Sequence, residues 1–466
     1  MIETKCSRIQ QTDITTMRIA DLRSRFSGKV ISEGDPDYDQ ARHVFYGDFD
    51  MKPWLIVQAA NVSDVAQAIS LACDTGLELA VRSGGHSAAG YGVSEGGIVL
   101  DLKNLKGIEI DVPSQTAWAE AGLTAKEFTN AAAEYGLATG FGDTGSVGVG
   151  GITLGGGVGF LLRKYGLTID NLLAAEVVSA DGRILHVDAA SHPDLFWAIR
   201  GGGGNFGVVT RFQFRLHQVD QVYGGMLILP ALADVIERFV SEADAAPEEL
   251  TTIANIMPAP PMPFIPPEFQ GRLVLMAQFL YAGPPEKGEE VLKPFRDIVK
   301  PIADMVKPMR YADIYPPEGE MMAPKVVTRT LFLDRVDPMT AQSIVDHLQQ
   351  SNAPMRVAQL RVLGGAMARV DKDATAFAHR DSHILANVAA FYAGPGDKES
   401  RQLWIEEFAK ALHQSDEGAY VGFMSEVEAK EIQRAYPGNT WKKLSEVKGE
   451  YDPDNIFRLN VNIPPQ

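Results

Sequence analysis

The loop Arg82-Ser83-Gly84-Gly85-His86-Ser87-Ala88-Ala89-Gly90 combines small residues with a single histidine. It follows residues 77–81, a short apolar run of the kind that forms a buried strand. Glycine reaches positive φ and has no Cβ, so such a loop lets the backbone approach a ligand closely. Its successive N–H groups form a concavity suited to phosphate. Taken alone, the loop could also be a glycine-rich turn that exposes His86.

Residues 145–159 form a second stretch of this kind, with eight glycines among fifteen residues. A flexible linker has no reason to interleave Val, Ile and Leu with its glycines, and a strand-like segment, residues 176–178, follows. The pattern is better explained by a backbone that wraps closely around a large planar ligand.

A third stretch, Gly201-Gly202-Gly203-Gly204-Asn205-Phe206-Gly207, contains the spacing G-x-G-x-x-G. A dinucleotide-binding loop with that spacing follows a strand and opens a helix. Here a helix-like segment, residues 193–200, precedes the glycines, and a strand-like segment, residues 208–214, follows them. This order argues against nucleotide binding of the Rossmann type.

The chain has 466 residues, enough for roughly two or three domains. Its formal net charge of −17 argues against nucleic acid and anionic membranes as partners, because both require basic patches. No apolar run is long enough to span a bilayer, and the N-terminus lacks the apolar core of a signal peptide, so we expect a cytoplasmic protein. The two cysteines, Cys6 and Cys73, cannot build a disulfide framework, and we expect Cys73 to be a buried thiol.

Short strands alternate with helices up to residue 217, which predicts an α+β or α/β domain with a mixed sheet. Strand-like runs then recur at residues 273–281, 329–333, 359–363 and 385–391, with helix-like segments at 341–350 and 400–413. These runs predict a second domain with an antiparallel sheet backed by helices. At the C-terminus we expect a helix that ends at Asp452-Pro453, followed by an Asn-rich tail.

These stretches, in this order, resemble the FAD-linked oxidases of the vanillyl-alcohol-oxidase (PCMH) type. The resemblance is specifically to the berberine-bridge-enzyme-like family and its bacterial 6-hydroxy-D-nicotine-oxidase-like members, and it covers nearly the whole chain. It implies a two-part FAD-binding domain over residues 1–217 (core about 49–217) and a substrate-binding domain over 218–415. A C-terminal segment, 416–466, is expected to return to the FAD-binding domain.

The resemblance implies that FAD is the cofactor and that His86 carries it through one covalent bond to the flavin 8α-methyl group. The glycine loops are expected along the pyrophosphate and the isoalloxazine, with residues 203–208 at the adenosine end. No metal ligands are expected. Besides His86, the residues that the resemblance assigns to FAD binding are Arg82, Ser83, Gly84, Gly85, Ser87, Gly145, Ser146, Val147, Gly150, Gly151, Gly155, Gly207, Val208, Asn460 and Asn462.

Two positions depart from the plant members of the family. A cysteine that attaches FAD a second time in those proteins is Thr144 here, and a tyrosine that serves them as a base is Val158. A second covalent link is therefore not expected. Val147 aligns with a position where valine is associated with oxidases and bulkier residues with dehydrogenases, which favours oxygen as the electron acceptor.

Tyr436 stands where related oxidases carry a catalytic tyrosine, and it is the candidate base for an alcohol or phenol substrate. An ordinary tyrosine has a pKa of about 10, so this role requires a neighbour that lowers the pKa. The alternative is a half-buried structural tyrosine. His379 and Arg380 belong to an expected strand pair, residues 364–370 and 375–380, and either line the pocket or hold the sheet to the FAD-binding domain.

The function implied is an FAD-dependent oxidase that takes a hydride from a small organic substrate (an alcohol, sugar or amine) to flavin N5 and reduces O2 to H2O2. The protein's part is to bind, orient and tune the flavin. A dehydrogenase of the same fold with another electron acceptor is the first alternative, and a flavin-carrying binding protein without turnover is the second. Specificity depends on side chains that vary among proteins of one fold, so the substrate and the oligomeric state stay open.

Overall fold

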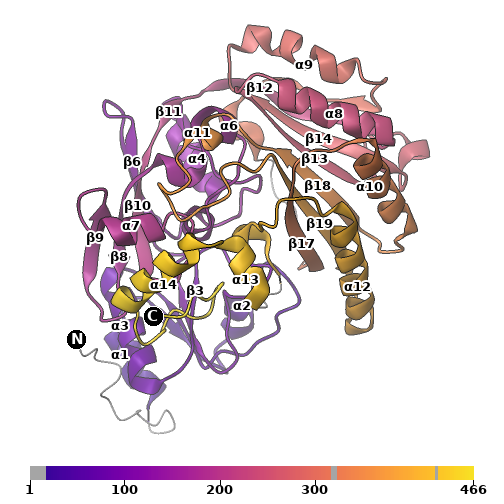
Figure 1. Ribbon diagram of the computed structural model, residues 1–466. Coiled ribbons are helices and arrows are strands. Elements are labelled where there is room, and N and C mark those ends of the chain that lie inside the picture. Colours follow the sequence, from indigo (N-terminus) through magenta and orange to yellow (C-terminus); the bar gives the residue numbers. More distant parts are fainter. Residues whose placement is uncertain (1–16, 316–322, 426–428) are drawn as a thin grey trace.

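The computed structural model describes residues 17–315, 323–425 and 429–466. Figure 1 shows an indigo-to-magenta lobe beside a pink-to-orange lobe, with the yellow C-terminal segment lying across the first. The first lobe contains a four-stranded and a five-stranded sheet, and the second contains an eight-stranded sheet. The predicted α+β architecture is confirmed.

The four-stranded sheet consists of β1 (Lys29–Ile31), β2 (Leu55–Gln58), β4 (Ile98–Asp101) and β3 (Leu79–Arg82), in that order. Strands β2 and β3 pair with β4 in parallel, whereas β1 is antiparallel to β2. All residues of β2 and β4 are buried, as expected for parallel strands that are covered on both faces. Strand β3 ends at Arg82 and so delivers the loop that carries His86.

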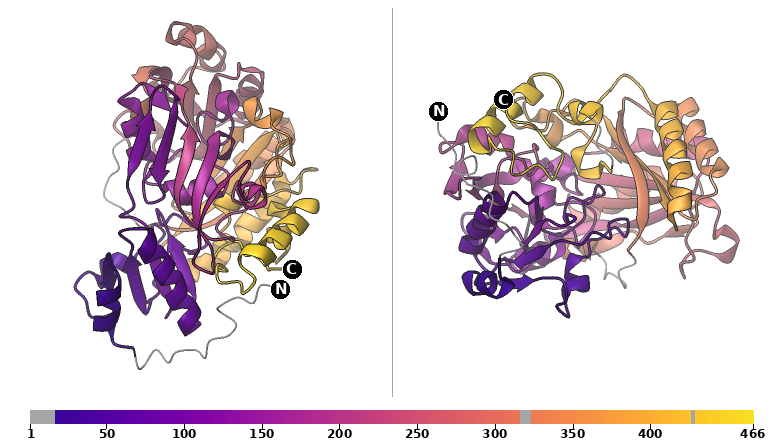
Figure 2. Two further views of the ribbon diagram at one scale, coloured as in Figure 1. Left: turned by 90° about the vertical axis from the view of Figure 1, so that its left-hand side faces the viewer. Right: turned by 90° about the horizontal axis from the view of Figure 1, so that it is seen from below.

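The five-stranded sheet is antiparallel throughout and lies above the four-stranded sheet in the left view of Figure 2. It consists of β5 (Ile108–Asp111), β6 (Thr116–Glu120), β10 (Val208–Arg215), β8 (Leu172–Val178) and β9 (Ile184–Asp188), in that order. Strand β10 begins directly after the third glycine stretch. Residues of this stretch and of the His86 loop line the same cavity.

The eight-stranded sheet is antiparallel, as predicted, and helices cover one of its faces (Figure 1). Its strands are β15 (Ala303–Asp304), β12 (Gln221–Pro230), β14 (Leu273–Tyr281), β13 (Leu250–Pro258), β18 (Arg356–Val362), β19 (Ile384–Tyr392) and β17 (Lys325–Leu333), with β16 (Lys307–Arg310) paired to β12. The covering helices are α8 (Ala233–Ala245), α9 (Gly288–Arg296), α10 (Pro338–Gln350) and α12 (Pro395–Leu412).

The other α-helices and strands of the described residues lie outside these three sheets and their covering helices. They are α1 (Ile19–Arg25), α2 (Tyr38–Arg42), α3 (Val62–Thr75), α4 (Ala125–Ala133), β7 (Leu137–Ala138), α5 (Val149–Leu154), α6 (Leu162–Tyr165), α7 (Pro193–Ala198), β11 (His217–Gln218), α11 (Ala366–Arg369), α13 (Ala429–Ala435) and α14 (Asn439–Tyr451). Among the described helices, none is long and apolar enough to cross a membrane.

The C-terminal helix α14 ends one residue before Asp452-Pro453, as predicted. Inside it, Lys448 Nζ lies 2.6 Å from Asp452 Oδ2, and neither side chain is exposed. The same ammonium donates to the carbonyl oxygens of Asn205 and Phe457. The tail then pairs with the third glycine stretch, because Asn205 Nδ2 donates to the carbonyl of Val461. The C-terminal segment is therefore anchored to the first lobe by buried polar contacts.

Two expectations are wrong. Residues 364–370 and 375–380 do not form a strand pair: the first segment contains α11, and Gly364 and Gly365 have φ of 96° and 61°, outside the range of a strand. Cys73 is not a thiol but takes part in a disulfide bond, and the other cysteine of the chain, Cys6, lies outside the described residues.

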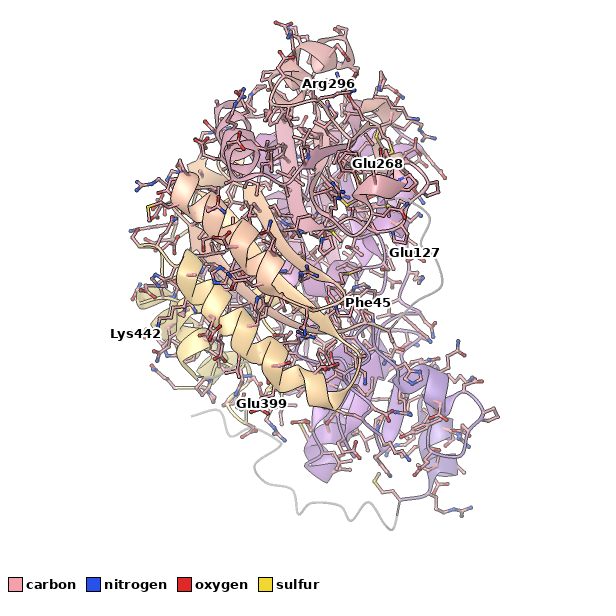
Figure 3. The ribbon with its side chains drawn as sticks, turned by 90° about the vertical axis from the view of Figure 1, so that its right-hand side faces the viewer. Phe45, Glu127, Glu268, Arg296, Glu399 and Lys442 are labelled. Carbon is pink, nitrogen blue, oxygen red and sulfur yellow. The ribbon has the colours of Figure 1, made fainter. Side chains whose placement is uncertain are left out.

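Breaking the buried Lys448–Asp452 ion pair should lower the stability of the protein. Lys448→Met leaves the Asp452 carboxylate buried without its cation, so we expect the free energy of unfolding to fall by about 3–5 kcal/mol in urea titrations. Lys442→Met is the matched control on the same helix, because Lys442 is exposed (Figure 3) and its ion pair with Glu446 is long, at 3.9 Å. It should change stability by no more than about 0.5 kcal/mol. Equal effects of the two variants would contradict the anchoring role.

Candidate functional site

A cavity of about 470 Å³ lies between the two lobes, within the size range of small-molecule sites. Its walls come from the His86 loop, from residues 142–158, from residues 203–209 and from the C-terminal tail at 457–461. A further wall is one face of β17, β18 and β19 together with residues 420–424. Three glycine stretches that are distant in sequence therefore meet at one site.

Most of the residues assigned to cofactor binding line this cavity. They are Arg82, Ser83, Gly84, Gly85, His86, Ser87, Val147, Gly150, Gly151, Gly155, Gly207, Val208 and Asn460. Gly145, Ser146, Asn462 and the candidate base Tyr436 are not among the lining residues. A Cβ on Gly145 would lie 3.0 Å from side-chain atoms of Lys126 and of Tyr315, so that glycine serves packing behind the wall.

The His86 loop and the second glycine stretch are in backbone contact. A Cβ on Gly84 would lie 2.2 Å from the backbone nitrogen of Gly148, a distance that real Cβ atoms do not adopt. Ser83 Oγ donates to the carbonyl of Ala121 at 2.6 Å, and Gly85 has a φ of 71°. The small residues of the loop are therefore required by the close approach of two backbones.

Arg82, the first residue of the His86 loop, anchors that loop to the neighbouring backbone. Its guanidinium is buried and donates to Asp101 Oδ2 at 2.8 Å and to the carbonyls of Ala41 and His43. The charge is therefore paired within the protein, and the side chain holds the end of β3 to its neighbour β4.

His86 lies against the ring of Phe45, with ring centroids 4.1 Å apart and an interplanar angle of 22°. Figure 3 shows Phe45 near the ends of the orange strands of the second lobe. The segment that follows Phe45 is tied to β17, because Gly47 N–H donates to the carbonyl of Pro324 and Val326 N–H donates to Asp48 Oδ2. One short segment thus connects the histidine to the eight-stranded sheet.

Arg361 on β18 forms the polar part of the opposite wall. Its side chain is 2% exposed and lies 2.6 Å from Asp143 Oδ2. It also donates to the carbonyl of Val158 and to Gln359 Oε1. The pair therefore joins the eight-stranded sheet to the segment just before the second glycine stretch.

Two tyrosines differ in their relation to the cavity. Tyr420 lines it, and its phenol oxygen accepts the N–H of Gly157 at 3.2 Å; burial nevertheless raises the pKa of Tyr420. Tyr436 is 1% exposed, and its hydroxyl has no hydrogen-bond partner in the described part of the chain. Burial raises the pKa of Tyr436 as well. A base requires a lowered pKa at this position, so the geometry does not support the catalytic assignment of Tyr436.

His379 and Arg380 lie outside the cavity lining and hold structural contacts instead. His379 is buried beside the carbonyl of Ala435 at 3.0 Å. Arg380 pairs with Asp170 at 2.7 Å and donates to Thr375. Of the two interpretations open from the sequence, the structural one agrees with this geometry.

Five further residues line the cavity outside every stretch that predicts the site: Phe45, Asp143, Arg361, Asn387 and Tyr420. One signal was present: Arg361 is a charged residue within the apolar strand-like run 359–363, and arginine is almost never fully buried unless it is paired. The partner could not be found from the sequence because Asp143 lies 218 positions away.

Two family models match the chain. One, described as FAD binding domain, covers residues 53–188, and the other, described as berberine and berberine like, covers residues 419–464. (R)-6-Hydroxynicotine oxidase of Paenarthrobacter nicotinovorans is 30% identical, with 94% of this chain and 97% of that protein covered. The uncharacterized FAD-linked oxidoreductase YgaK of Bacillus subtilis is also 30% identical, with 95% and 98% covered.

Solved structures agree with these matches. The crystal structure of 6-hydroxy-D-nicotine oxidase from Arthrobacter nicotinovorans superposes with a TM-score of 0.84 and 26% identity, covering 95% of this chain and 98% of that one. A chitooligosaccharide oxidase, at 20% identity and a TM-score of 0.81, has the same fold. The chain therefore belongs to the berberine-bridge-enzyme-like family of FAD-linked oxidoreductases, as the order of its glycine stretches predicts.

Proposed function

We propose that this chain carries FAD through a single covalent bond to His86 and oxidises a small organic substrate with O2 as the electron acceptor, releasing H2O2. The proposal depends on the position of His86 in the wall of a glycine-lined cavity that also faces the eight-stranded sheet. Bound FAD supplies the acceptor for the substrate's hydride and the donor of two electrons to O2. The relatives named as oxidases support this choice.

The cavity walls fit FAD in two respects. Gly151 and Gly204 line the cavity, and a Cβ on either would meet no atom within 4 Å, which leaves room for a ligand against the backbone. Asn460 lines the cavity as well, and its buried Oδ1 has no hydrogen-bond partner among the described residues. An acceptor of this kind suits the N–H of a flavin ring or a ribose hydroxyl. Gly145, Ser146 and Asn462 lie outside the lining, so they would support the residues that contact FAD and would not contact it themselves.

The protein's residues orient and enclose the reacting groups. Phe45 stacks against the His86 imidazole, and the Arg361–Asp143 pair joins the opposite wall to the segment before Gly145. Val147 in the lining is small and apolar, which supports O2 as the acceptor. We assign residues 1–217 and 416–466 to the FAD-binding side and 218–415 to the substrate side.

The covalent bond has a direct test. His86 would hold the flavin through its imidazole, and a covalent bond at this position would survive denaturation of the protein. Acid precipitation of the wild-type protein should give a yellow pellet, and the His86→Ala pellet should be colourless with a yellow supernatant. A colourless wild-type pellet would refute the covalent bond, and a protein without flavin absorbance would refute the proposed function.

Substitutions of two glycines distinguish a residue required for protein packing, Gly84, from one that leaves room for a ligand, Gly151. Gly84→Ala forces two backbones apart and should lower the free energy of unfolding by about 3 kcal/mol. Gly151→Ala meets no protein atom and lies in α5, so it should leave stability unchanged or raise it by about 0.5–1 kcal/mol. Its methyl group enters the cavity, so the flavin-to-protein absorbance ratio should fall. Full flavin content in Gly151→Ala would show that FAD does not lie against this wall.

Tyr436→Phe removes an unpartnered buried hydroxyl. We expect turnover within about twofold of wild type and a free energy of unfolding that is unchanged or higher by up to about 1 kcal/mol. Tyr420→Phe is the comparison, because it removes a cavity-lining hydroxyl and leaves the Gly157 N–H without its acceptor, at a cost of about 1–2 kcal/mol. Loss of turnover in Tyr436→Phe alone would restore Tyr436 as a catalytic residue.

A further inference from the structure

The cavity wall formed by the second lobe is one face of three neighbouring strands. Residues that alternate along β17 and β19 line the cavity, as expected from the two-residue period of a strand, and β18 adds two more beside them. These side chains are Val326, Thr328, Val357, Arg361, Asn387, Ala389 and Phe391. Since the glycine stretches form the proposed flavin side, this wall contacts the substrate, and the inference below rests on the proposed function.

The charged groups of the cavity are already paired. Among the described lining residues, the arginines are Arg82 and Arg361, and each has a carboxylate at hydrogen-bond distance, Asp101 and Asp143 respectively. Arg361 is further satisfied by Gln359 and a carbonyl. A substrate that carries a charge would lose its hydration here and find no free counter-ion. The wall thus selects against both anions and cations.

One polar group on this wall keeps a free donor. Thr328 Oγ1 donates to Asn387 Oδ1 at 2.5 Å, which orients the amide and leaves its Nδ2 without an acceptor among the described residues. The neighbouring amide of Gln359 differs, because its Nε2 donates to Asn255 and its Oε1 accepts from Arg361. Asn387 is half-buried and lines the cavity. Its amide N–H therefore suits an oxygen on the substrate.

We propose that the substrate of this enzyme is an uncharged, largely apolar molecule with an oxygen that accepts a hydrogen bond from Asn387. The apolar part lies against Val326, Val357 and Phe391, and the oxygen lies beside the Thr328–Asn387 pair. Sugar acids, phosphorylated compounds and substrates bound as ammonium ions are outside this class.

Three probes of similar shape test whether the site prefers an uncharged ligand: benzyl alcohol, benzoate and the benzylammonium ion. Each is titrated into the flavin-containing protein at neutral pH, and binding is followed by the change in the flavin absorbance spectrum. Benzyl alcohol should bind at least about 100-fold more tightly than either ion, because each ion would be buried without a counter-charge. Equal or tighter binding of an ion, or no binding of benzyl alcohol, overturns the inference.

Two variants of Asn387 test the donor. Asn387→Leu should weaken benzyl alcohol about tenfold, the loss expected for one hydrogen bond, while ethylbenzene, which has no oxygen, binds as to the wild type. Asn387→Asp preserves the side-chain shape and supplies a negative charge, so it should weaken benzyl alcohol and strengthen benzylammonium at least about tenfold. Unchanged affinities in both variants overturn the role of Asn387. A flavin-free wild-type protein would instead refute the proposed function, which separates the two failures.

Discussion

The backbone contact between Gly84 and Gly148 is the constraint on which the cavity depends. No Cβ fits at Gly84, where it would lie 2.2 Å from the Gly148 nitrogen. The loop after β3 and the start of α5 therefore form one surface without intervening side chains. Since β3 belongs to the four-stranded sheet and α5 follows the five-stranded sheet's first hairpin, this contact also fixes how the two sheets of the first lobe meet.

Two buried polar connections complete the enclosure. The Arg361–Asp143 pair joins the second lobe to the segment before Gly145, and Lys448 and Asn205 join the C-terminal tail to the third glycine stretch. Buried ion pairs add little net stability, but removing one partner is costly. These buried polar contacts therefore determine how the cavity walls are arranged. The apolar cores of the two lobes supply most of the stability.

The parts of this structure that could be predicted from sequence are those with local signals. Glycine stretches in a recognisable order predicted the family, and alternating apolar runs predicted the strands of the second lobe. The site was predicted less completely, because contacts such as Arg361 with Asp143 join residues that no local pattern relates. The expected strand pair at 364–380 was wrong, since Gly364 and Gly365 adopt positive φ and turn the chain into α11. Tyr436 was assigned by its place in a motif, and motifs carry no information about burial.

The segment 45–48 has a mechanical consequence. Phe45 rests on the His86 ring, while Gly47 and Asp48 are bonded to the first residues of the β17 region. The two lobes therefore cannot tilt relative to each other without displacing the ring that contacts the histidine. A change in the angle of the eight-stranded sheet would displace this segment together with the Arg361–Asp143 pair, which joins the same two lobes. A new substrate specificity is accordingly easier to obtain by exchanging side chains on the sheet than by moving the sheet itself.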